Sequence, residues 1–147
     1  MADSFLDDTR EARLTLALIG AVAGFAFYLF AEVLDQDDIG AIPFLFLISS
    51  VLGFFGVALA LVGPARTGPA FVGAGAIAVP SALLLCLAAW RFETLDDLSN
   101  SGREIVAFIV IVAIATPFVA VFLKDRSRWR DYPELFDAAW GIVVRYA

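Results

Sequence analysis

Four long runs of apolar residues constrain this chain more than any other feature of its sequence. Each is about as long as a helix must be to cross roughly 30 Å of hydrocarbon at about 1.5 Å per residue. A segment inside a bilayer has no water to satisfy its backbone N–H and C=O groups, so each run is expected to be helical. We predict an all-α integral membrane protein, a bundle of four transmembrane helices with spans at residues 14–34, 42–62, 69–90 and 105–123.

The composition indicates the same class. Apolar residues make up 61% of the 147 residues and charged residues only 18%, against roughly 45–50% and about 25% in soluble domains. The expected spans take up most of the chain. We therefore expect residues 1–147 to form a single membrane domain.

The residue types in the chain restrict its chemistry. There is no His and a single Cys, which excludes imidazole catalysis, an intrachain disulfide and a zinc cluster. No charged residue falls at the middle of an expected span, where such groups are costly and usually functional. The acidic run 35–38 lacks the spacing of an EF-hand. We predict no catalytic residue, no cofactor, no metal site and, from the net charge of −6, no nucleic-acid partner.

Basic residues predict the orientation, because cytoplasmic loops of membrane proteins are enriched in Lys and Arg. One side of the expected topology carries only Arg91 and Arg103, whereas the other carries Arg10, Arg13, Arg66 and the bases after the fourth span. The second side, with the N terminus, is expected to be cytoplasmic. There, anionic lipid headgroups are the expected partner of Lys124, Arg126, Arg128 and Arg130.

Small residues recur at helical spacing in the first two spans. Gly20 and Gly24 form a GxxxG pair, and Gly53 and Gly56 belong to a ridge of small residues. Such patterns let helix backbones approach closely, which favours association in lipid. We expect both to pack helices of this chain against one another. Formation of a homo-oligomer through Gly20 and Gly24 is the alternative.

Two prolines lie within expected spans. Pro80 and Pro117 each remove a backbone donor and free the carbonyl four residues earlier, so kinks are expected there. The freed carbonyls belong to Ala76 and Ala113, and Ser81, Thr116 or a neighbouring helix are candidate partners for them.

The longest loop lies between the third and fourth spans. Residues 94–98 are expected to form a short interfacial turn. Ser101 and Glu104 have the spacing of a capping box, which would start the fourth helix.

A short motif follows the basic segment and consists of Tyr132, Pro133, Leu135, Phe136, Asp137 and Trp140. It resembles a motif of the bacterial membrane proteins grouped as the domain of unknown function 4153 family, in which Tyr-Pro, Leu-Phe and Ala-Trp pairs follow a basic segment. The resemblance implies a multi-pass protein of the bacterial inner membrane and implies no activity. Family members are longer, so this chain would correspond to their N-terminal part.

The same residues predict an amphipathic helix at 132–147 on physical grounds alone. Pro133 suits a first helical turn, and Glu134 and Asp137 would lie near its positive N-terminal end. A crossing needs about 20 residues. We expect this helix to lie at the inner interface or against the other helices, and to lead into a fifth crossing if further sequence follows.

Three function classes agree with these features. An accessory or scaffolding membrane subunit fits best, because the chain offers packing ridges and polar loops without a reactive centre. A transport-related, permease-like component comes second, with the proline-containing helices lining a path. An enzyme acting on lipid comes third, since the carboxylates lie outside the middle of the spans.

The predicted topology can be tested by cysteine labelling of intact cells. In a Cys86→Ala background, cysteines at Asp37 and Asp96 should react with an impermeant maleimide, whereas a cysteine at Trp129 should react only after permeabilisation. Labelling of position 129 in intact cells would contradict the scheme.

Overall fold

The computed structural model describes residues 2–32, 39–62, 67–125 and 131–146, and every regular element in these ranges is a helix. The acidic run 35–38, the loop 63–66 and the bases Arg126, Arg128 and Arg130 lie outside the described residues. The helices are α1 (Ala2–Glu32), α3 (Ala41–Leu61), α4 (Thr67–Ala89), α5 (Leu95–Ser101), α6 (Arg103–Lys124) and α7 (Tyr132–Tyr146).

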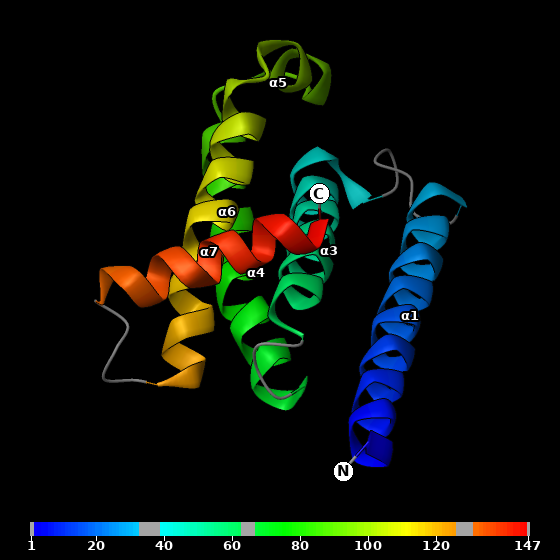
Figure 1. Ribbon diagram of the computed structural model, residues 1–147. Coiled ribbons are helices and arrows are strands. Elements are labelled where there is room, and N and C mark those ends of the chain that lie inside the picture. The colour runs from blue at the N-terminus through cyan, green and yellow to red at the C-terminus, as the bar shows by residue number, and fades with distance from the viewer. Residues whose placement is uncertain (1, 33–38, 63–66, 126–130, 147) are drawn as a thin grey trace.

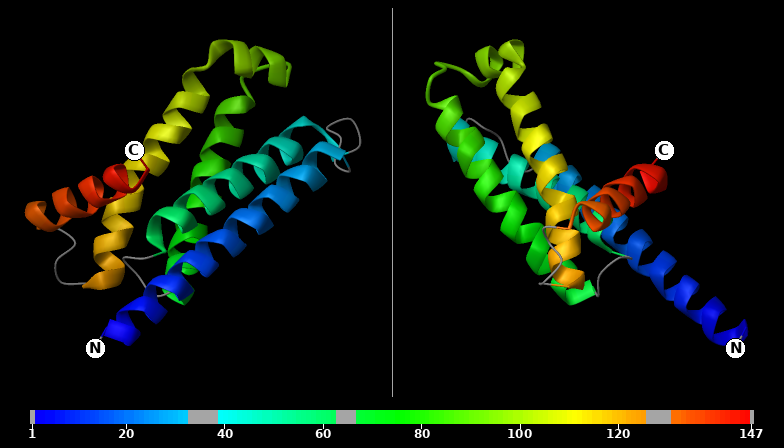
Figure 2. Two further views of the ribbon diagram at one scale, coloured as in Figure 1. Left: turned by 45° about the vertical axis from the view of Figure 1, so that its right-hand side comes forward. Right: turned by 60° about the vertical axis from the view of Figure 1, so that its left-hand side comes forward.

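Three of the helices form the centre of the molecule. Helix α4 packs along both α3 and α6, whereas α3 and α6 touch each other only lightly. Helix α1 runs beside α3, away from α6, and α7 runs across the bundle (Figures 1 and 2). The N terminus and the end of α6 lie at one end of the bundle, here called the Lys124 end, and α5 lies at the other (Figure 1).

The prediction of long apolar helices is confirmed for three segments. Helices α3, α4 and α6 are each long and apolar enough to cross a membrane, and they coincide with the expected spans at 42–62, 69–90 and 105–123. The expected span at 14–34 overlaps α1 as far as Glu32, and residues 33–34 lie outside the described residues. The apolar segment of α1 is the shorter Leu14–Phe30. The chain is therefore an all-helical protein with at least three helices of spanning length and apolarity.

Small residues on α4 determine how closely the central helices pack. Ala70, Ala74 and Ala82 have no exposed surface, so the neighbouring helices lie almost against the α4 backbone. The tightest point is Gly73, where an added Cβ would lie 2.8 Å from Val119 Cγ1 of α6 and 3.2 Å from Leu61 Cδ1 of α3. A side chain at this position would require Val119 to move and the ends of Leu61 and Leu123 to shift.

The turn expected at residues 94–98 is a complete short helix, α5. Its N-cap is Thr94, whose hydroxyl accepts a hydrogen bond from the Asp97 N–H at 3.2 Å. The expected capping box at the start of α6 is not formed. Gly102, in the left-handed conformation with φ of 66°, is at once the C-cap of α5 and the N-cap of α6, and Ser101 instead donates its hydroxyl hydrogen to the Glu104 carboxylate.

Both prolines lie inside helices, Pro80 in α4 and Pro117 in α6. Among the candidate partners, Thr116 does not satisfy the carbonyl of Ala113. Its hydroxyl donates to the carbonyl of Val112 at 2.6 Å and not to that of Ala113, because a hydroxyl on a helix reaches its own i−4 carbonyl most easily.

The glycines of α1 do not pack as expected. Gly20 and Gly24 are exposed, and an added Cβ at either would meet no described atom within 4 Å. Helix α1 instead contributes Ile19, which is 4% exposed, to the core. Within this chain the GxxxG pair thus has no helix against it among the described residues.

Gly73 and Gly75 offer a matched test of this packing. Gly73→Ala should lower the melting temperature in detergent by several degrees, because overpacking costs about 1–3 kcal/mol and exceeds the gain of up to about 1 kcal/mol in helix propensity. Gly75→Ala should leave it unchanged or raise it, because nothing lies within 4 Å of that Cβ position. Equal melting temperatures of the two variants would contradict the assigned packing.

Candidate functional site

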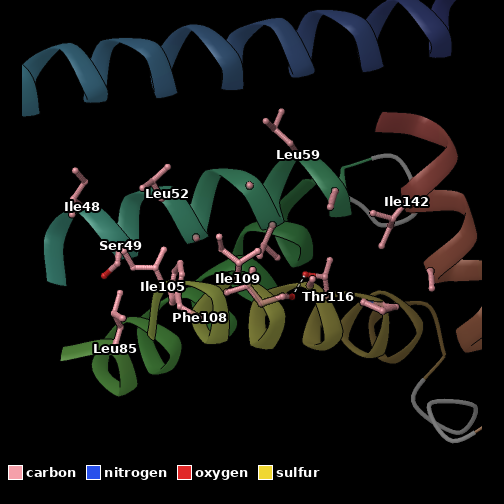
Figure 3. A pocket seen from close by; sticks show the side chains of 18 of the residues that line it. Ile48, Ser49, Leu52, Leu59, Leu85, Ile105, Phe108, Ile109, Thr116 and Ile142 are labelled. Carbon is pink, nitrogen blue, oxygen red and sulfur yellow. Dashed lines mark hydrogen bonds between the residues drawn. The ribbon is translucent and has the colours of Figure 1, made fainter. Parts of the chain in front are cut away.

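The structure contains an apolar groove between α3 and α6. It has a cavity volume of about 790 Å³. In Figure 3, Ser49 of α3 and Ile105 and Ile109 of α6 lie between the two helices, whereas Ile48, Leu52 and Leu59 point away from α6, and Ile142 enters from α7 at one end. Helix α3 lines it over Leu45–Ala60, α6 over Ile105–Pro117, α4 through Leu85 and α7 through Ala139, Ile142 and Val143.

The groove exists because α3 and α6 pack on α4 and diverge from one another. At Gly53 the three central helices are still in contact, since an added Cβ would lie 3.3 Å from Ala78 Cβ of α4 and 3.4 Å from Phe108 Cζ of α6. One turn further along α3, at Gly56, an added Cβ would meet nothing within 4 Å. Gly53 therefore closes a helix contact, whereas Gly56 leaves its backbone open to the groove.

The lining is almost entirely hydrocarbon. Its described residues include none that ionises, and the hydroxyls of Ser49 and Thr116 are both at least nine-tenths buried. Each hydroxyl donates to a carbonyl of its own helix, Ser49 to Leu45 and Thr116 to Val112, both at 2.6 Å. The donor of each hydroxyl is thereby satisfied inside the protein. The groove is suited to an apolar occupant, because a polar or charged one would lose hydration without replacement.

Helix α7 closes the groove toward the Lys124 end. The side chains of Ala139 and Ile142 face the bundle, and Ala138 packs against the central core. Lys124 Nζ, at the end of α6, lies 3.6 Å from Glu134 Oε2 in the first turn of α7, with 67% and 27% of the side chains exposed. A pair this exposed contributes at most about 1 kcal/mol, so apolar packing holds α7 in place.

The residues of the sequence motif lie on α7 but do not line the groove. Tyr132, Phe136 and Trp140 are exposed on one side, and the rings of Tyr132 and Phe136 stack with centroids 6.4 Å apart. Leu135 is half-buried and Asp137 is exposed. Pro133 lies in the first turn.

The basic segment is described only at its start. Lys124 is exposed and paired with Glu134. The headgroup contacts expected of Arg126, Arg128 and Arg130 fall outside the described residues.

Sequence reasoning identified the ridge of α3 but not the groove beside it. The spacing of Gly53 and Gly56 predicts a small-residue face, and it does not tell which member contacts a neighbouring helix. On α6, the sequence pointed only to Thr116 and Pro117. The structure places both in the opposite wall of the groove.

The comparisons with known proteins found no relative. No family model, no curated protein and no solved structure matches the chain.

The groove can be tested with a matched pair of leucine substitutions. Gly53→Leu should lower the melting temperature in detergent, because its side chain would displace Ala78 and Phe108. Gly56→Leu should leave the melting temperature within the error of the wild type, because its side chain enters the groove. A comparable loss in both variants would show that the groove is closed in solution.

Proposed function

We propose that this chain is an accessory or scaffolding subunit of the bacterial inner membrane, and that it holds a transmembrane helix of a partner protein in the groove between α3 and α6. The observation that carries the proposal is the open backbone at Gly56 within an apolar lining. Helices associate in lipid through close backbone approach over small residues, because apolar side chains gain little by leaving lipid.

The length of the groove supports a helix that lies along it and inserts the side chains of one face. The α3 wall extends over Leu45–Ala60, which at about 1.5 Å per residue is about 22 Å, or most of the hydrocarbon thickness. The hydroxyls of Ser49 and Thr116 already donate to carbonyls of their own helices, so they do not favour a charged ligand. The alternative of a transport-related component gains no support from this lining, because it offers nothing to replace the hydration of a polar solute.

We propose four crossings with the N terminus in the cytoplasm. Helix α1 contributes its apolar segment Leu14–Phe30 as the first crossing and lies beside α3. The N terminus and Lys124 lie at the same end of the bundle (Figure 1), as an even number of crossings requires. The bias of Lys and Arg toward this end supports its cytoplasmic location. The assignment to the domain of unknown function 4153 family is part of the proposal and rests on the motif between Tyr132 and Trp140.

Site-specific photocrosslinking in native membranes tests the partner helix. A photoreactive residue at Ile109, which lines the groove and is 57% exposed, should give one defined protein adduct. Gly56→Leu should abolish this adduct, because it fills the groove. Gly75→Leu, on the part of α4 where an added Cβ meets nothing, should preserve it.

The outcome separates the occupants of the groove. Adducts to lipid alone, or a protein adduct that persists in Gly56→Leu, would contradict the proposed function. An adduct to a second copy of this chain would replace the partner subunit by a homo-oligomer.

A further inference from the structure

Helix α7 has a second apolar side that no described residue covers. Tyr132, Phe136, Trp140, Val143 and Val144 are between 56% and 77% exposed. Their spacing of four, four, three and one residues places them on one side of a helix. We call these five residues the aromatic face.

The other sides of α7 differ in character. Leu135, Ala138, Ala139 and Ile142 are half-buried and recur at three- and four-residue spacing, so they form the side that packs on the bundle. Glu134 and Asp137 lie between the two apolar sides and form a polar edge. Most of the circumference of α7 is thus apolar, but only one part of it contacts this chain.

The ion pair marks where α7 begins relative to α6. Lys124 is the last residue of α6, and its Nζ lies 3.6 Å from Glu134 Oε2, so the first turn of α7 lies near the end of α6. Apolar packing on the bundle keeps α7 there. The groove-lining part of α7 shares that lining with Thr116 and Pro117, which lie about 10 Å before Lys124 along α6 at about 1.5 Å per residue. Helix α7 runs across α6 and not along it (Figure 1). Interfacial helices bury their apolar side about 5–10 Å into the same region of a bilayer.

Exposed apolar side chains also occur on the last part of α6. Phe118 and Phe122 of this long apolar helix are each 42% exposed, within two turns of Lys124. The composition of the face also fits, because Tyr and Trp place an apolar ring and a polar tip at the level of the headgroups.

We propose that the aromatic face of α7 is a lipid-binding surface, immersed at the boundary of headgroups and acyl chains in the leaflet at the Lys124 end. Helix α7 is then an interfacial anchor that holds this end of α6 at a defined depth. The proposal is independent of the occupant of the groove, because the groove and the aromatic face share only Val143.

Fluorescence of Trp140 tests the proposal in vesicles of phosphatidylcholine that carry bromine at defined acyl positions. In a Trp90→Phe, Trp129→Phe variant, Trp140 should emit at a shorter wavelength than water-exposed indole and lose about half of its intensity to shallow bromines. Deep bromines and aqueous iodide should quench it less. A variant that keeps only Trp90, which is 73% exposed at the other end of α4, is the matched control.

Two results would overturn the proposal. Strong quenching by iodide without quenching by bromine would place the aromatic face in water. Resistance to both quenchers, unchanged when the protein is diluted with lipid, would mean that protein covers the face.

A second measurement does not depend on the tryptophans. In a Cys86→Ala background, a nitroxide at Val144 should be more accessible to oxygen than to an aqueous nickel complex, and a nitroxide at the polar-edge residue Asp137 should show the reverse. Equal accessibility of both positions to nickel would contradict the interfacial placement.

Discussion

The close approach of α3 and α6 to the backbone of α4 is the interaction on which the rest of the structure depends. In a membrane the helices gain little by hiding apolar side chains, so packing density must hold them together. Gly73 provides that density by allowing Val119 and Leu61 to lie where a side chain would otherwise be. Because both neighbours pack on α4, they have few contacts with one another, and the groove follows from this arrangement.

The groove and α7 present two surfaces that differ in what they expose. The wall of α3 exposes backbone at Gly56, which suits a helix, whereas the aromatic face of α7 exposes rings, which suit lipid. Neither surface carries a reactive group among the described residues that form it. The proposed function and the proposed lipid-binding surface each rest on one of these two surfaces.

The sequence predicted the central helices closely, because uncharged apolar runs of this length have few alternatives in lipid. The sequence predicted helix contacts poorly, because these contacts depend on which helix lies opposite each residue. Gly53 and Gly56 are three residues apart on one ridge, yet only Gly53 meets another helix. Similarly, the GxxxG pattern of Gly20 and Gly24 predicts a close helix contact, and no described residue makes one. The α3–α6 groove depends on how two helices diverge, and no local pattern encodes that divergence.

Gly102 gives the bundle an unequal flexibility. It terminates α5 and begins α6 at once, so no residue between these helices can absorb a displacement. Helix α5 is itself anchored by Leu98, which is only 2% exposed, and the Gly53 contact with Phe108 lies between this end and Gly56. The α5 end of α6 is therefore its more constrained end. A guest that widened the groove would displace α6 least at this end and most near Lys124, where α7 begins.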